Sequence, residues 1–495
     1  MIRLRIPSLG QLPLFLPPVV FASVNACYLV LFDLPLSTVT LFYVVVLEFA
    51  AIGLSFNVAE ILCAWTFGEI LPPRSATLED FPPVALLCVT CDDSDPDVLR
   101  LLNTQTYSNL TVFVLDDSRS ERHRSIVDAS GLPVFRRENR DGYKAGNLNN
   151  WLRNHGRQFM YFVVADADSI LPPDFVDTMV RYAEHPANRD IAMFESLIRA
   201  WNTTSLFAAL LDALAFLPAR YRLRVTNRLG STLSVGHNNL YRTDAVASLG
   251  GFTEHFLAED FATCITLVSG GTWRCRAVPV ISFERQPENI GEFARRQSRW
   301  AYQTLQLLEL DVPRLSWSIT LELFRALHYY ISPLVMILGL LLSLLVNLQE
   351  LVLASTMPSA KALIEGPMSP LWLFFLTWLL VPILGVSILA RHHGVALRHV
   401  LGAVLLNSAL FTVTSWVVAR QVALYARRQR RPFTVTGRRM TPTLLDTFLI
   451  AGPVGILLWS VMITTCLNPA ALPNLAWLIP ACLGPLIVYV CQRSR

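Results

Sequence analysis

The sequence predicts an α/β domain inserted into a polytopic α-helical membrane domain. The chain of 495 residues is 53% apolar and only 16% charged, with a mean hydropathy of +0.44, whereas soluble proteins carry about 25% charged residues. Apolar stretches long enough to cross ~30 Å of hydrocarbon gather towards the two ends of the sequence. Between them, short apolar runs alternate with helical segments, which is typical of a parallel α/β sheet.

Two apolar stretches precede the α/β domain, and several follow it. Residues 13–32 come first, after a basic start that resembles a signal peptide. Because no small-residue cleavage site follows, we expect this helix to be retained. The other stretches are 41–66, 329–354, 371–391, 397–420, 445–466 and 473–491.

Basic residues beside the apolar stretches predict the orientation, because they favour the cytosolic side. They lie at Arg3 and Arg5, in 294–299, in 427–440 and in the last four residues. Three crossings between the α/β domain and 427–440 would put that loop outside, so we expect 397–420, the most polar stretch, to be interfacial or re-entrant. Six spans then remain, with the α/β domain and both termini in the cytosol. The net charge of +4 therefore indicates topology in a lipid bilayer, and no nucleic-acid partner is expected.

The expected organisation follows in chain order. It comprises two N-terminal transmembrane helices (1–66), a cytosolic α/β domain (67–312), an interfacial helix (313–328), transmembrane helices with the interfacial or re-entrant segment 397–420 (329–426), a cytosolic loop (427–444) and two C-terminal transmembrane helices (445–495).

Three buried strands are predicted to end in carboxylates. They are VALLCVTCDD (84–93), LTVFVLDDSRS (110–120) and MYFVVADADSI (160–170), and parallel sheets bind ligands at the carboxyl ends of their strands. A single Asp there is often a turn or cap residue. Asp166 and Asp168, however, are two residues apart on an extended chain and so point the same way. Two such carboxylates suit Mg²⁺ or Mn²⁺, which could bridge to a diphosphate.

Two further stretches are open to more than one interpretation. In RENRDGYKAGNLNN (137–150), Lys144 and two glycines suit an anionic phosphate, although KAGN could equally begin a helix and no Walker pattern is present. In FLAEDFATC (256–264), Glu259 and Asp260 could be acids that stabilise a helix N-terminus. They could instead include a general base.

Taken in order, these motifs resemble the membrane-embedded, processive family 2 glycosyltransferases, the group that contains cellulose synthase. That pattern is a strand-end Asp pair, KAGN, DxD, a TED-like triplet and QxxRW, followed by membrane helices. The matching positions are Asp116–Asp117, Lys144–Asn147, Asp166–Asp168, Ala258–Asp260 and Arg296–Trp300, and the family's gating loop is similar to Phe433–Thr436. The resemblance covers residues 84–300 and extends to the membrane context.

Two positions depart from the pattern. Ala258 stands where the triplet has Thr, and Arg296 stands where Gln is usual. The periplasmic β-glucan glucosyltransferases also lack that Gln, and this chain is similar to them in Gly236–Asn238 and in 282–289. The resemblance therefore implies a β-glucan other than cellulose.

The resemblance implies a nucleotide-sugar-binding domain of GT-A type that transfers a sugar, with UDP-glucose favoured as donor, to a growing glycan, with inversion. Asp260 would be the base, and Asp166 and Asp168 would hold Mg²⁺ or Mn²⁺. The remaining roles implied are nucleotide-sugar binding by Asp93, Asp116, Asp117, Lys144, Asp166 and Arg299; acceptor binding by Trp300, Glu259, Gly236, His237 and Asn238; and gating by Phe433, Val435 and Thr436.

Other interpretations stay open. Trp300 could be a core residue that anchors an interfacial helix, with arginines reaching to lipid headgroups. The protein could add one sugar to a membrane lipid without processivity, or it could be a catalytically silent glycan channel or regulator. The resemblance implies the cytoplasmic membrane as location and leaves room for a periplasmic or regulatory partner subunit.

Overall fold

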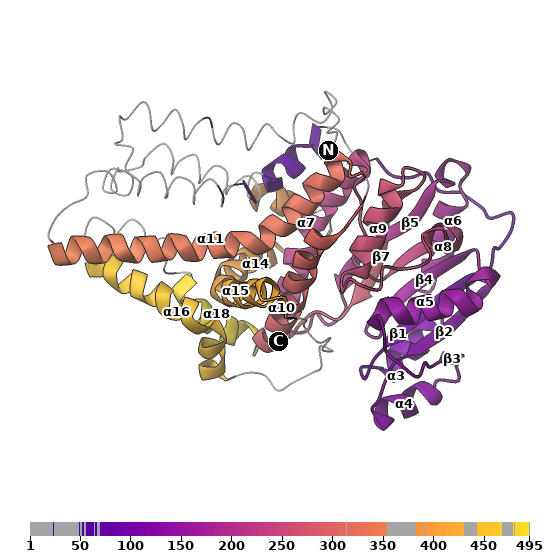
Figure 1. Ribbon diagram of the computed structural model, residues 1–495, viewed down its shortest axis with the longest axis horizontal. Helices are drawn as coiled ribbons and strands as arrows, with labels where there is room; N and C mark the ends of the chain where they lie inside the picture. Colours follow the sequence, from indigo (N-terminus) through magenta and orange to yellow (C-terminus); the bar gives the residue numbers. More distant parts are fainter. Residues whose placement is uncertain are drawn as a thin grey trace.

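The computed structural model describes most of the α/β domain and part of the membrane region. The described residues are 23, 49, 52–53, 56–63, 65–66, 70–312, 314–353, 383–391, 393–429, 443–467, 479 and 481–494. Most of the first two expected spans and the gating-type residues Phe433, Val435 and Thr436 lie outside them. Figure 1 shows the sheet at one end and the long helices α11 and α16 at the other.

A seven-stranded sheet in the order β3-β2-β1-β4-β6-β5-β7 forms the centre of the α/β domain. Its strands are β1 (Val84–Thr90), β2 (Leu110–Asp116), β3 (Val134–Phe135), β4 (Tyr161–Asp166), β5 (Ile191–Ala200), β6 (Asn239–Arg242) and β7 (Arg274–Glu284). β1 pairs in parallel with β2 and β4, as expected, and β5 pairs in parallel with β7.

The expectation of an all-parallel sheet is wrong at β6, which runs antiparallel to both β4 and β5. After β5, the chain passes through α7 (Leu206–Leu229) and enters β6 from the carboxyl edge of the sheet. A parallel strand would need a crossover that returns the chain to the opposite edge. The reversal therefore puts residues 230–238 beside the end of β4.

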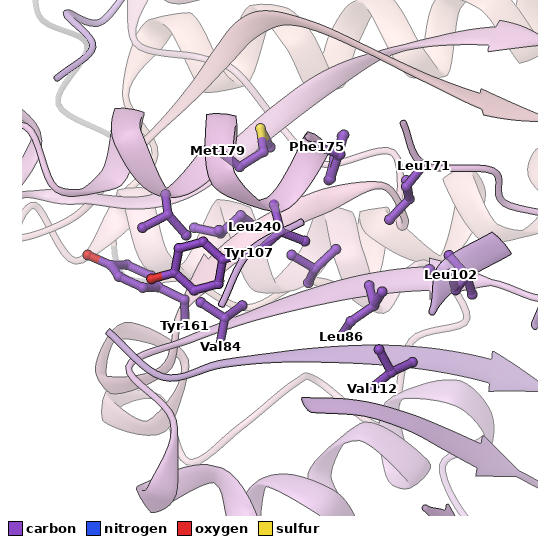
Figure 2. Close-up of a cluster of buried hydrophobic side chains, with 14 of the residues drawn as sticks. Val84, Leu86, Leu102, Tyr107, Val112, Tyr161, Leu171, Phe175, Met179 and Leu240 are labelled. Atoms are coloured by element: carbon purple, nitrogen blue, oxygen red, sulfur yellow. The ribbon is translucent and has the colours of Figure 1, made fainter. Parts of the chain in front are cut away.

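Helices cover both faces of the sheet. On one face, β1 residues Val84 and Leu86 pack with α3 (Pro96–Leu102) and α6 (Phe175–Ala183), and Figure 2 shows this cluster. On the other face, Ala85 and Leu87 pack with α5 (Tyr143–His155) and α9 (Glu259–Ser269). This alternation is the period of two that an extended strand dictates. Each large apolar side chain buried in this way contributes about 1.5–3 kcal/mol.

Two helices connect the sheet to the membrane region. α7 packs on α14 (Leu397–Ala409), and α10 (Ile290–Gln306) packs on α15 (Phe411–Ala426). Smaller elements are α4 (Glu121–Asp128), α8 (Thr243–Ser248) and α18 (Gly484–Cys491). The two parts of the chain therefore share packed helices.

The segments expected at 313–328 and 329–354 belong largely to one helix, α11 (Trp317–Leu353). Within the described residues, Trp317–Gln349 and Thr447–Leu467 of α16 (Leu444–Leu467) are long and apolar enough to cross a membrane. α14 and α15 meet at a bend of 47° inside the expected segment 397–420. Both a broken span and a re-entrant segment would have such a bend, so the topology stays a prediction.

A cluster of buried ion pairs joins α7 and α11 to the helical residues 56–63. Arg222 Nη2 of α7 lies 3.0 Å from Glu322 Oε2 of α11. Arg325 lies one turn further along α11, with Nε 3.5 Å from the same oxygen, and it also pairs with Glu60. We call these four residues the helix ion-pair cluster.

Candidate active site

A cavity of about 850 Å³ opens at the carboxyl edge of the sheet, within the size range of small-molecule sites. The ends of β1 and β4, the first turns of α5 and α9, the loop before β6 and one face of α10 line it. The predicted residues among its walls are Asp93, Asp117, Lys144, Asp166, Asp168, Gly236, Glu259, Asp260, Arg299 and Trp300.

Asp166 ends β4, and its carboxylate faces the first turn of α5. Lys144 Nζ lies 2.5 Å from Asp166 Oδ1. Burial alone would raise the pKa of Asp166, but the Lys144 ammonium holds it below its ordinary value. Asp168 has no such ion-pair partner among the residues described. Burial and the neighbouring carboxylates of Glu284 and Asp166 raise the pKa of Asp168 to about 7, and Trp201 Nε1 fixes its backbone by donating to its carbonyl oxygen at 3.0 Å.

The two aspartates fit a divalent cation. The raised pKa of Asp168 means that the nearby positive charge of His237 does not offset burial and the neighbouring carboxylates, and a bound cation would supply more. Across the described ranges, no group of three or more His, Cys, Asp or Glu side chains makes a complete metal site. Mg²⁺ commonly binds through one or two carboxylates and completes its shell with water and substrate phosphates, so this incomplete donor set suits it.

Glu259 and Asp260 are the first two residues of α9, and both line the cavity. Burial, followed by the charge of Asp260, raises the pKa of Glu259 to about 8. Burial also raises the pKa of Asp260. Both are therefore helix N-terminal acids, and the raised pKa makes each a stronger base than an ordinary carboxylate, as general-base catalysis requires.

Gly236 allows the loop before β6 to approach Asp260 closely. Its φ of +104° is unfavourable for any residue with a side chain. A Cβ at this position would lie 2.8 Å from Asp260 Oδ2. The carbonyl oxygen of Gly236 also accepts a hydrogen bond from Lys144 Nζ at 3.0 Å. This glycine therefore holds the general-base candidate next to the lysine.

Gly146 is one of the two glycines of 137–150 that we expected to let the backbone approach a phosphate. In the structure it allows close packing within the chain. A Cβ there would lie 1.9 Å from the carbonyl oxygen of Asp141 and 2.6 Å from Arg137 Nη1. The glycine thus lets the chain's own loop fold over α5. The atoms that a side chain at this position would meet belong to the Asp141 backbone and the Arg137 guanidinium.

Asp93 and Asp117 line the cavity end that lies beside β1 and β2. Asp93 Oδ1 accepts hydrogen bonds from Thr90 Oγ1 and from the Cys91 N–H, both at 2.8 Å. Arg137 donates two hydrogen bonds to Asp117, from Nε to Oδ1 at 2.9 Å and from Nη2 to Oδ2 at 2.7 Å. Both carboxylates are therefore fixed in orientation.

Asp116, which was predicted to bind nucleotide sugar, is not among the residues that line the cavity. Its side chain is fully buried and accepts from Arg136 Nε at 2.7 Å and from the Ser118 N–H at 2.8 Å. Because adjacent residues of an extended chain point to opposite sides, Asp116 turns away where Asp117 turns in. Its role is to shape the loop after β2.

His237 and Asn238, predicted to bind acceptor, also lie behind the cavity wall. His237 Nε2 lies 3.0 Å from Glu284 Oε2, and its Nδ1 lies 3.7 Å from Asp166 Oδ2. Burial would lower the pKa of His237, but the Asp166 and Glu284 carboxylates raise it to about 9. Asn238 has a φ of +56° and donates from Nδ2 to the carbonyl of Phe283 at 3.2 Å. Of the three residues 236–238, Gly236 lines the cavity.

Arg299 and Trp300 reach the cavity from α10. Trp300 is 38% exposed and lines the cavity, so it is not a core residue. The guanidinium of Arg296 lies 4.7 Å from the centre of the Trp300 ring, one helical turn away. The unusual Arg296 therefore packs against the tryptophan in a cation–π contact.

A model of the family described as glycosyl transferase family group 2 matches residues 161–479. The chain belongs to this family. The resemblance inferred from the motifs is thus confirmed.

Relatives of this family 2 chain include proteins named glucans biosynthesis glucosyltransferase H. The one from Xylella fastidiosa is 27% identical over 275 residues, which are 49% of this chain and 42% of the relative. The one from Bradyrhizobium diazoefficiens is 25% identical over 430 residues, which are 80% of this chain and 55% of the relative. The chain spans about half the length of these curated relatives.

The fold also resembles that of a mannosyltransferase of known structure. The mannosyltransferase PcManGT from Pyrobaculum calidifontis, solved with GDP-Man and Mn²⁺, superposes with a TM-score of 0.51 at 16% identity. The match covers 70% of this chain and 98% of the mannosyltransferase. At this identity the similarity shows the GT-A-like α/β fold alone.

Several cavity residues of this family 2 chain were missed by the motifs. They are Asp92, Arg122, His123, Arg140, Tyr143, Trp201, Arg285 and Gln303. Asp92 was the most accessible to sequence reasoning, because it belongs to the acidic end of the first strand. Its φ is +62°, and its Oδ1 accepts from the N–H groups of Arg119 and Ser120 at 2.7 Å. Arg140 and Tyr143 lie in the stretch 137–150 and Arg285 lies in 282–289, but the sequence assigned them no role, and the others come from segments without a motif.

Proposed function

We propose that this protein is an inverting glycosyltransferase that polymerises glucose from UDP-glucose into a β-glucan and moves the product across the cytoplasmic membrane. One observation carries the proposal: a single cavity gathers a DxD pair, a lysine, a general-base candidate and an exposed tryptophan. The names of the curated relatives support glucose and glucan as donor sugar and product.

The donor would lie along the strand ends. Asp93 and Asp117 would hold the uridine, since both carboxylates are oriented by hydrogen bonds. Asp166 and Asp168 would hold Mg²⁺ or Mn²⁺, and such an ion, when bound, offsets negative charge on the departing diphosphate. Arg299, which shares the cavity, would add positive charge beside the same group.

Asp260 would take the proton of the acceptor hydroxyl as the hydroxyl oxygen attacks C1 of the glucose. The new C1–O bond forms on one face while the bond from C1 to the diphosphate oxygen breaks on the other. A single displacement of this kind turns an α-linked donor into a β-linked product. Lys144 donates a hydrogen bond to the carbonyl of Gly236, which lies beside Asp260. It would therefore hold the diphosphate in a fixed position relative to the base.

The growing glycan would leave past α10. The face of Trp300 that Arg296 does not cover is available to stack on a pyranose ring, because Trp300 is 38% exposed at the cavity. The apolar helices α11 and α16 then begin the path through the bilayer. We place the cavity and both termini on the cytosolic side. The proposal is compatible with a periplasmic or regulatory partner subunit.

The alternative is transfer of one sugar to a membrane lipid, which would use the same donor site. The experiment that separates them is a radiolabel assay on purified protein in lipid, with a panel of UDP-sugars and either Mg²⁺ or Mn²⁺. We expect long chains from UDP-glucose that β-glucanases digest. Label confined to a one-sugar glycolipid would overturn the polymerase proposal and favour the alternative.

A matched pair of variants sharpens that assay. Trp300→Ala should shorten the product by removing the stacking face. Trp273→Ala removes a partly buried tryptophan that directly precedes β7, at the edge of the sheet opposite the cavity, and should leave product length unchanged. Equal product lengths from both variants would remove Trp300 from acceptor binding.

A further inference from the structure

An unbroken series of polar contacts runs behind the cavity wall from Trp300 to Asp166. Arg296 packs on the Trp300 ring at 4.7 Å and donates from Nη1 to Gln286 Oε1 at 2.6 Å. Gln286 Nε2 in turn donates to Glu284 Oε1 at 2.5 Å. The two ends of Gln286 therefore face an arginine and a carboxylate at once.

The series continues to the donor side. Glu284 Oε2 lies 3.0 Å from His237 Nε2, and His237 Nδ1 lies 3.7 Å from Asp166 Oδ2. Asp166 then pairs with Lys144 at 2.5 Å. On either side of the neutral Gln286 amide, basic groups contact carboxylates or the amide oxygen, so each contact favours the next.

The middle of the series does not touch the cavity. Arg296, Gln286, Glu284 and His237 are not among the residues that line it, and Gln286 is only 4% exposed. Its backbone is also fixed, because its N–H donates to Asn202 Oδ1 at 2.9 Å and its carbonyl accepts from Asn202 Nδ2 at 2.8 Å. These residues therefore lie outside the cavity lining, although they connect Trp300 on the acceptor side with Asp166 on the donor side.

We propose that this series couples the two halves of the site, so that acceptor binding at Trp300 and donor binding at Asp166 strengthen each other. Arg296 and Gln286 are positioning residues in this scheme. Ordering Trp300 fixes the guanidinium of Arg296, which fixes Gln286 and the Glu284–His237 pair, so less freedom remains to be lost when the donor orders Asp166. The inference rests on the proposed function, because it takes Trp300 as the acceptor contact.

The test measures the affinity of UDP with Mn²⁺ for the full-length protein in lipid, with and without a saturating β-gluco-oligosaccharide. In the wild type we expect the oligosaccharide to tighten UDP binding about 10-fold, and UDP to tighten oligosaccharide binding by the same factor. Gln286→Leu keeps the volume and removes both hydrogen bonds. It should reduce the 10-fold effect to about 1-fold while UDP alone still binds, because the residue touches neither ligand.

The matched control is Gln297→Leu. Gln297 lies on α10 next to Arg296, is likewise 4% exposed, and has no part in the series. This variant should keep the full mutual effect. Arg296→Gln is a second variant that interrupts the series, because it removes the guanidinium that contacts Trp300. With two variants, the test does not depend on the folding of one.

The outcomes are distinct. Coupling retained in a folded Gln286→Leu or Arg296→Gln protein overturns the inference. A wild type that binds UDP and oligosaccharide independently also overturns it, yet leaves the proposed function intact. A wild type that does not bind UDP with Mn²⁺ at all overturns both.

Discussion

The cavity and the helix ion-pair cluster both bury charged side chains, but they balance the charge differently. In the cluster, two glutamates meet two arginines, and each acid has a basic partner. In the cavity, burial raises the pKa values of Asp93, Asp168, Glu259 and Asp260, and neighbouring carboxylates add to the rise for Asp93, Asp168 and Glu259. Buried charges with partners are compatible with a stable fold, whereas burying a carboxylate without a cationic partner costs folding free energy. Such carboxylates are typical of sites where a ligand supplies the missing charge.

The largest effect should follow from Asp260→Asn. Loss of a general base typically lowers the rate 10²- to 10⁴-fold, and removing a carboxylate beside Glu259 relieves repulsion, so the melting temperature should not fall. Turnover of UDP-glucose and thermal unfolding measure the two effects. Asp97→Asn, a change at an exposed carboxylate of α3, should alter neither. Full turnover in Asp260→Asn would return Asp260 to a helix N-terminal role, whereas an absence of turnover in the wild type itself would favour the silent-channel interpretation.

The opposite pattern is expected for Arg325→Met in the helix ion-pair cluster. The change leaves Glu60 and Glu322 without that partner, and breaking a buried pair costs about 3–5 kcal/mol. The protein should unfold at a lower temperature while any folded fraction keeps its turnover. Arg100→Met removes an exposed pair with Asp97 and should cost less than about 1 kcal/mol. Equal losses in the two variants would contradict the comparison.

The smallest effect concerns Glu195, a buried residue of β5. Burial raises its pKa from an ordinary 4.5 to about 8. Between these values the folded state binds more protons than the unfolded state, so stability should fall as pH rises from 4.5 to 8. Glu195→Gln should flatten that decline in melting temperature measured between about pH 5 and 9. Parallel curves for the two proteins would mean that Glu195 does not titrate in this window.

Much of the site could be predicted because local chemistry determines it. The alternation in β1 gives the two core faces, and the acids after β1, β2 and β4 meet because parallel strands end at one edge. The same alternation could have excluded Asp116, since Asp116 and its neighbour Asp117 cannot both face one cavity.

What could not be predicted depends on contacts between distant segments. The direction of β6 is set by where α7 ends, and no local pattern in residues 239–242 encodes it. The burial of His237 follows from that reversal together with Glu284 on β7. Arg296 was noticed as a departure from the family pattern, but its contact with Gln286 required the packing of α10 against the end of β7.

α11 has one more consequence. Its 37 residues correspond to about 55 Å at 1.5 Å per residue, and a bilayer core uses about 20 of them. In the predicted topology, the rest, on the order of 25 Å, would stand between the sheet and the hydrocarbon. A helix of this length would fix the distance of the proposed base Asp260 from the lipid surface, which a loop of equal length would not.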